Sequence, residues 1–162
     1  MHVFLDGACE DYGRSVTCGA VLYSGEGPPQ FFGLVISEKV CAEWRAPGVT
    51  QLIVQAELFP RLVALRTWGP VLRGKLVVWW FDNDSVRFSS IKGYSPSLPS
   101  CRILSEASVE DARISLLSWF GRVPTASNVA DAASRLDWKT LLRDEPSAVW
   151  APPSVPVTWL FG

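Results

Sequence analysis

The sequence has little that would support a metal centre of histidine and cysteine. His2 is the only histidine, and the four cysteines (Cys9, Cys18, Cys41 and Cys101) show no C-x-x-C spacing. A structural zinc site needs four such ligands at close spacing, so the sequence argues against one. A disulfide framework is equally unexpected in a chain of 162 residues that has enough apolar side chains for a core. We expect reduced, mostly buried cysteines and an intracellular location, in the cytoplasm or the nucleus.

Long apolar runs and an excess of positive charge are also missing. No apolar stretch approaches the roughly 18 residues of a membrane-spanning helix, and the first residues lack the basic and apolar regions of a signal peptide. The formal net charge is −1, whereas proteins that hold nucleic acid by charge alone are usually basic. We therefore expect no membrane partner, and any nucleic-acid binding has to rely on local features, metal ions or a linked domain.

Apolar and aromatic side chains are what the chain has in abundance. It is 48% hydrophobic and 19% charged, with 8 tryptophans and 8 phenylalanines, which favours a folded core over disorder. The length suits one compact domain. The composition changes after residue 143, where prolines become frequent. We expect a catalytic domain over 1–143 and an extended tail or linker over 144–162.

The first third of the chain predicts an antiparallel meander. Three apolar segments, over 2–8, 17–24 and 30–37, are separated by short connections, one of which (25–29) is rich in glycine and proline. Consecutive strands joined by short turns pair antiparallel.

A helix follows over 51–69 and closes at Gly69-Pro70. Pro60 lies inside this segment, and an interior proline costs about 3 kcal/mol. We therefore expect the regular helix to begin near Leu58, so that Pro60 falls in its first turn.

The segment 75–81 is apolar on both faces, which predicts a central strand. The remaining segments predict a short helix over 84–95, a loop over 96–102, a longer helix over 103–121, an edge strand over 122–125 and a last helix over 126–138. The expected fold is mixed α/β: a five-stranded mixed sheet with three antiparallel N-terminal strands and flanking helices.

Four carboxylates fall at the ends of these predicted elements. Asp6 closes the first strand, Asp82 follows "VVWWF" at the end of the fourth strand, Glu57 lies at the start of the first helix, and Asp131 lies in the first turn of the last helix. If the first and fourth strands are neighbours, Asp6 and Asp82 emerge side by side. The two helix starts then bring Glu57 and Asp131 over the same edge of the sheet.

Each of these residues also has an ordinary structural interpretation. An Asp before glycine is common in turns, so Asp6 suits a turn, and Glu57 and Asp131 suit the N-terminal ends of helices. Asp84 competes with Asp82 for a functional role, but its position favours the N-cap of the next helix. Asp82 is the hardest to explain without function, because so apolar a strand has no structural need for a terminal carboxylate.

Together, the four carboxylates indicate a metal site. Acids this close repel one another unless divalent cations lie between them. Oxygen ligands alone select hard ions, Mg²⁺ or Mn²⁺ as its substitute. Two such ions about 3.5–4 Å apart form the arrangement that hydrolyses phosphodiesters.

Several motifs resemble the ribonuclease H family over roughly residues 2–138: "FLDGA", "QAEL", "WFDND" and "SNVADAASR". More narrowly, "DNDSVRFSSIKGYS" followed by "RVPTASNVADAASR" resembles the ribonuclease H domain that accompanies the reverse transcriptases of retroelements.

This resemblance implies a reaction and a set of roles. Asp6, Glu57, Asp82 and Asp131 would be the catalytic metal ligands, with two Mg²⁺ ions. The reaction would be endonucleolytic cleavage of the RNA strand of an RNA–DNA hybrid, leaving a 5′-phosphate and a 3′-hydroxyl. Among candidate substrate-binding residues, Asn83 would touch the substrate backbone, and Arg135 would either contact a phosphate or close a structural ion pair.

The resemblance also implies partners: the hybrid and a covalently linked reverse transcriptase domain. The chain departs from the family in one respect. Many members carry a histidine in a loop shortly before the last carboxylate, and here the only histidine is His2.

Two other classes of function stay open. A degenerate domain that serves as a structural or interaction module would explain the missing histidine, the acidic isoelectric point and the many aromatic residues, but four mutually repelling acids argue against it. A DNA exonuclease or an integrase-type enzyme on the same fold is the third candidate. The carboxylate spacing and the Ala-Asp-x-x-Ser-Arg ending fit it less well.

Overall fold

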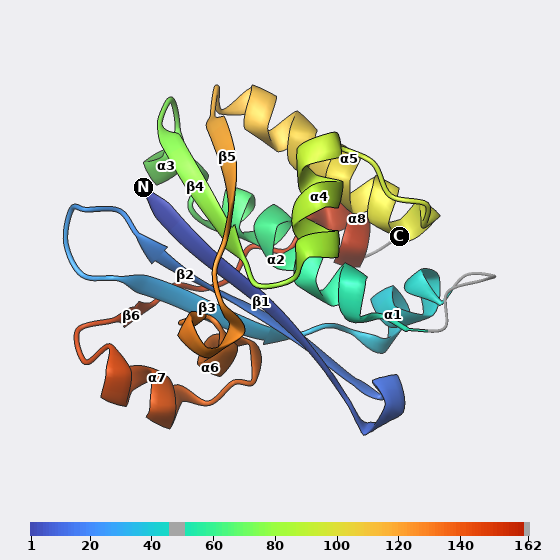
Figure 1. Cartoon of the computed structure of the whole chain (residues 1–162), viewed down its shortest axis with the longest axis horizontal. Coiled ribbons are helices and arrows are strands. Elements are labelled where there is room, and N and C mark those ends of the chain that lie inside the picture. The colour runs from blue at the N-terminus through green and yellow to red at the C-terminus, as the bar shows by residue number, and fades with distance from the viewer. Residues whose placement is uncertain (46–50, 161–162) are drawn as a thin grey trace.

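A computed structural model describes residues 1–45 and 51–160 and shows one mixed sheet flanked by helices (Figure 1). The sheet has six strands in the order β5-β4-β1-β2-β3-β6. The strands are β1 (His2–Glu10), β2 (Ser15–Tyr23), β3 (Gln30–Val35), β4 (Leu76–Phe81), β5 (Leu117–Arg122) and β6 (Val149–Trp150). The helices are α1 (Glu38–Trp44), α2 (Ile53–Thr67), α3 (Gly69–Leu72), α4 (Asp84–Lys92), α5 (Leu98–Arg113), α6 (Asp131–Ser134), α7 (Trp138–Asp144) and α8 (Val157–Leu160), with 3₁₀ turns at η1 (Asp11–Gly13) and η2 (Thr125–Ser127).

The predicted fold class is confirmed. Strands β1, β2 and β3 form the antiparallel meander, β4 is parallel to β1, and β5 is parallel to β4. The strand count was wrong by one, because β6 pairs parallel with β3.

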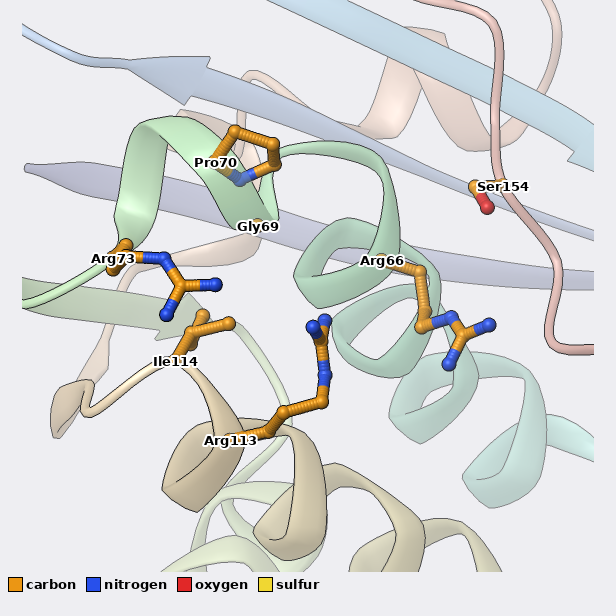
Figure 2. A pocket seen from close by; sticks show the side chains of 7 residues that line it. All are labelled: Arg66, Gly69, Pro70, Arg73, Arg113, Ile114 and Ser154. Atoms are coloured by element: carbon orange, nitrogen blue, oxygen red, sulfur yellow. The ribbon is translucent and has the colours of Figure 1, made fainter.

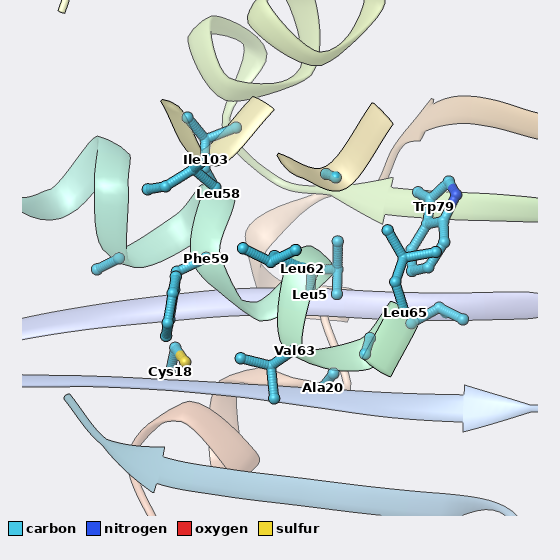
Figure 3. Packing of buried hydrophobic residues seen from close by; sticks show 14 of the residues in the cluster. Leu5, Cys18, Ala20, Leu58, Phe59, Leu62, Val63, Leu65, Trp79 and Ile103 are labelled. Atoms are coloured by element: carbon cyan, nitrogen blue, oxygen red, sulfur yellow. The ribbon is translucent and has the colours of Figure 1, made fainter. Parts of the chain in front are cut away.

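The core lies between the sheet and α2. Figure 3 shows Leu58, Leu62 and Leu65 of this helix packed over Leu5 and Trp79 of the strands. All five side chains are at most 2% exposed, and burying one such side chain stabilises the fold by about 1.5–3 kcal/mol. A smaller cluster holds α6 and α7 against the other face of the sheet.

The predicted start of α2 near Leu58 was wrong. The helix begins at Ile53 and contains Pro60 in its interior. Burial explains this result, because the first turns already place Gln55 and Ala56 in the interior. Tertiary packing of these turns outweighs the cost of about 3 kcal/mol that an interior proline carries.

The boundaries of the next two elements were also wrong. Helix α5 covers Leu98–Arg113 and β5 covers Leu117–Arg122, whereas the sequence predicted a helix over 103–121 and a strand over 122–125. Pro99 lies in the first turn of α5. Backbone N–H groups in a first turn form no hydrogen bond within the helix, so a proline there costs none. The helix ends before Ser115, whose positive φ of 54° breaks the helical path.

The predicted helix over 126–138 is divided. Its first part is η2 and α6, and its last residue begins α7. Leu136 separates the two helices with a positive φ of 58°. Helix α1, after β3, was missed; its N-cap is Ser37, whose side chain accepts a hydrogen bond from Val40 N.

Residues 144–160 lie against the rest of the chain. They form β6 and α8, and Trp159 is 2% exposed beside Trp44 and Phe59. Residues 151–156 between β6 and α8 have no regular secondary structure. That residues 144–162 act as a tail or linker stays a prediction. That residues 1–143 carry the catalysis on their own stays a prediction.

All four cysteines are free in the structure. Cys18 and Cys41 are buried, and Cys9 and Cys101 are partly buried. In the part of the chain that the structure describes, no helix has the length and apolar character to cross a membrane.

Candidate active site

The pairing of β1 with β4 brings the first two carboxylates together. The parallel register places Phe4 beside Trp80. Asp6 and Asp82 each follow two residues further along their chains, and both line the same pocket. Asp6 does not close its strand, however. Strand β1 continues to Glu10, because it pairs with β2 along its whole length. Asp6 is therefore held rigidly by a central strand, and Asp82 follows directly after β4.

A close contact between α2 and β1 positions Glu57. A Cβ atom at Gly7 would lie 2.3 Å from the carbonyl carbon of Ala56 and 2.6 Å from the backbone nitrogen of Glu57. Only glycine permits this approach. Glu57 is the fifth residue of α2 rather than its first, and the missing side chain at Gly7 brings it down onto the strand.

Two polar contacts attach the segment that carries Asp131 to β1. The side chain of Asn128 donates a hydrogen bond of 3.0 Å to the carbonyl of Leu5, and Ser134 Oγ donates to Asp6 Oδ2. Asp131 opens α6 between these two anchors and forms an ion pair of 3.0 Å with Arg135.

All four predicted carboxylates line one open pocket of about 480 Å³. Asn83 and Arg135, the two predicted substrate-binding residues, line it as well. The complete lining is Asp6, Gly7, Glu57, Asp82, Asn83, Asp84, Arg122, Thr125, Asp131 and Arg135. Within the described residues, no group of three or more acids, histidines or cysteines is arranged closely enough to hold a metal ion as it stands.

The electrostatics of the pocket show why cations fit it. The pKa of Asp6 is raised from 3.8 to about 6, chiefly by burial and also by the charges of Asp82 and Asp131, against a hydrogen bond from Ser134. Burial also raises the pKa of Glu57, from 4.5 to about 8, with Asp82 and Asp6 adding to the increase and Asn83 opposing it. Carboxylates that resist ionisation together are stabilised in their charged form by divalent cations.

The stability of the metal-free protein should fall as the pH rises from about 4 to 8. Asp6 and Glu57 have raised pKa values, so the folded state binds more protons than the unfolded state in this range. Between pH 5 and pH 8.5 the expected loss is on the order of 1 kcal/mol for Asp6 and 4 kcal/mol for Glu57, at 1.36 kcal/mol per pH unit. Urea unfolding at pH 5 and pH 8.5 with EDTA measures it.

Glu57→Gln is the matched variant for this experiment, because it removes the group with the higher pKa and should flatten the curve above pH 6. Added Mg²⁺ should restore the wild-type stability at pH 8.5 more than at pH 5. A metal-free stability that does not change with pH would contradict the electrostatics described above.

Sequence reasoning misjudged or missed several residues of the pocket. Asn83, not Asp84, caps α4, with its Oδ1 accepting from Ser85 N at 2.9 Å. Asp84 pairs instead with Arg87 and Arg122. Arg122 was missed because β5 was predicted too late; in the observed register it pairs with Phe81, one residue before Asp82.

The hydroxyl of Ser134 donates a hydrogen bond to Asp6. The "AASR" stretch alone gives no signal for that contact. His2 lies elsewhere: its ring stacks on Trp80 and accepts a hydrogen bond of 3.0 Å from the indole nitrogen.

Neither a protein-family model nor a curated protein matches the sequence. Solved structures do match. A ribonuclease H1 from Halobacterium salinarum superposes with a TM-score of 0.65 at 21% identity, covering 86% of this chain and 97% of that one. LC11 ribonuclease H1 in complex with an RNA/DNA hybrid superposes with a TM-score of 0.66 at 14% identity, and the match covers 86% of this chain and 98% of that one. An N-terminal ribonuclease H domain from Mycobacterium tuberculosis superposes with a TM-score of 0.59 at 13% identity, and the match covers 88% of this chain and 96% of that one.

These three matches cover 96–98% of the solved chains, and all three chains are ribonucleases H. The chain therefore has the ribonuclease H fold, as the sequence motifs predicted. At these identities the comparison establishes the architecture, and the chemistry has to be argued from the pocket.

Proposed function

We propose that this protein is a ribonuclease H, a nuclease that hydrolyses the RNA strand of RNA–DNA hybrids with the help of divalent metal ions. One observation carries the proposal: Asp6, Glu57, Asp82 and Asp131 come from four separate segments and line a single pocket. The fold supports it, since one similar structure is a ribonuclease H1 bound to an RNA/DNA hybrid.

The four carboxylates would hold the metal. They offer oxygen donors only, which favours Mg²⁺, with Mn²⁺ as a substitute. When bound, two such ions supply an activated water and charge stabilisation at the leaving oxygen. The expected products are a 5′-phosphate and a 3′-hydroxyl.

The surrounding side chains orient the acids and the substrate. Ser134 fixes one oxygen of Asp6 by its hydrogen bond. Asn83 uses its Oδ1 to cap α4, and its amide group lowers the pKa of Glu57 by hydrogen bonding. An amide has two hydrogens, so the second would contact the substrate backbone. Arg135 bridges Asp131 and Glu10 at the rim, where its remaining N–H groups would contact a phosphate. The hybrid would be recognised by the shape of its minor groove and by its 2′-hydroxyls.

We also propose that the chain acts beside a linked reverse transcriptase domain of a retroelement. The motifs "DNDSVRFSSIKGYS", which follows β4, and "RVPTASNVADAASR", which includes α6, support this origin. A net charge of −1 predicts weak hybrid binding by this chain alone. A linked polymerase domain would raise the effective concentration of the hybrid. An intracellular location fits the four free cysteines.

Substrate discrimination tests the proposal. One labelled sequence is offered as an RNA–DNA hybrid, as a DNA duplex and as an RNA duplex, in Mg²⁺ and in Mn²⁺. Cutting of the hybrid alone is the expected result. Preferential cutting of the DNA duplex would favour a DNA nuclease of the same fold.

One observation favours a second candidate, a non-catalytic interaction module. Within the described residues, no three potential ligands converge closely enough for a metal site. A folded protein that cuts none of the three duplexes at high concentration, in either metal, would make this module the better account.

A further inference from the structure

A second pocket, of about 400 Å³, lies away from the carboxylates and is lined by three arginines (Figure 2). Arg66 comes from the last turn of α2, Arg73 follows α3, and Arg113 ends α5. We call it the arginine pocket; Gly69, Pro70, Ile114 and Ser154 complete its lining.

The arginine pocket is separate from the candidate active site. The two pockets share no lining residue. Arg66 and Glu57 lie on one helix, nine residues apart, which is about 14 Å along the axis at 1.5 Å per residue. The arginine pocket lies by the start of β4, whereas Asp82 follows the end of that strand.

A buried carboxylate holds two of the arginines in place. Glu110, which is 7% exposed, accepts hydrogen bonds of 2.6 Å from Arg66 Nη1 and of 2.6 Å from Arg113 Nε. Burial alone would raise the pKa of Glu110, but the two arginines outweigh it and the pKa lies below its ordinary value. Glu110 therefore stays ionised and fixes two guanidinium groups from different helices.

The third arginine has no partner of this kind. Arg73 forms no ion pair or side-chain hydrogen bond within the described residues, and Figure 2 shows its guanidinium extending toward Arg113. Gly69 leaves space beneath Arg113, because a Cβ there would lie 3.7 Å from Arg113 Nη2. Three arginines and one carboxylate give the arginine pocket a net charge of +2.

We propose that the arginine pocket binds a phosphate monoester dianion, either free phosphate or the terminal phosphate of a nucleotide. Guanidinium groups match phosphate oxygens with paired hydrogen bonds. A terminal phosphate carries a charge of about −1.5 to −2 near neutral pH. This charge matches the net charge of +2 of the arginine pocket better than the charge of −1 on a carboxylate or an internal phosphodiester does. The inference does not depend on the proposed nuclease activity.

Calorimetric titration of the whole chain tests the proposal, with EDTA present and the ionic strength held constant. The probes are inorganic phosphate, adenosine monophosphate and adenosine. We expect both phosphates to bind and adenosine not to bind. Equal affinity for the two phosphates identifies free phosphate as sufficient, and tighter binding of the nucleotide identifies a terminal phosphate.

Arg73→Ala should weaken binding about tenfold, the worth of one charge-assisted hydrogen bond. Arg14→Ala is the matched control, because Arg14 is exposed and lies outside the arginine pocket. Gly69→Asp should also weaken binding, since it places a carboxylate among the arginines with ordinary contacts at its Cβ. Ligand should raise the melting temperature of the wild type more than that of either pocket variant.

Absence of phosphate binding by the folded wild type would overturn the proposal. Equal losses in Arg73→Ala and Arg14→Ala would overturn it too, because they would show attraction by overall charge.

Discussion

Asp82→Asn should lower hybrid cleavage roughly 10³-fold or more, because a lost metal ligand removes several kcal/mol of transition-state stabilisation. The same change should stabilise the metal-free protein above pH 6. The charge of Asp82 raises the pKa of both Asp6 and Glu57, so its removal makes their ionisation less costly. Single-turnover cleavage and urea unfolding measure the two effects.

Asp84→Asn is the matched control, two residues away. Asp84 also lines the pocket, but it is paired with Arg87 and Arg122. It should lose far less activity and show no gain in stability at high pH. Equal losses in the two variants would mean that Asp82 is not a metal ligand.

Trp159→Ala should destabilise the fold by about 3–5 kcal/mol, the usual cost of truncating a buried aromatic side chain. Trp159 packs edge-on against Trp44 and Phe59, and its indole nitrogen donates a hydrogen bond of 2.8 Å to Glu106. For a chain of this size the melting temperature should fall by roughly 10 °C.

Trp150→Ala provides the control within the same C-terminal segment. Trp150 is 52% exposed on β6, so its truncation should cost about 1 kcal/mol or less. If the two variants unfold at the same temperature, residues 157–160 do not pack into the core as described.

The parts of the site that follow from strand order could be predicted from sequence. In a sheet of this type the first strand, which carries Asp6, is expected beside the apolar strand that leads to Asp82. The parallel pairing of β1 with β4 confirms that these strands are neighbours. Asp131 was placed near them by its expected position at the start of a helix, and it lines the same pocket.

The parts that depend on contacts distant in the chain could not be predicted. The sequence gives no sign that Gly7 admits the backbone of Ala56, and this contact places Glu57 of α2 close to β1. Strand β6 pairs only through Val149 and Trp150. Two residues are too few to show the alternation of apolar and polar side chains by which a strand is predicted from sequence. Ser134 reaches Asp6 across more than a hundred residues.

The most direct test of the central claim is cleavage of one RNA–DNA hybrid labelled differently on its two strands. The protein is incubated with the hybrid in EDTA, and Mg²⁺ is then added to the same sample. We expect no cutting before the addition and cutting of the RNA strand alone after it, with 5′-phosphate ends. Cutting in EDTA, or cutting of the DNA strand, would contradict the account of a carboxylate-held metal site for RNA hydrolysis.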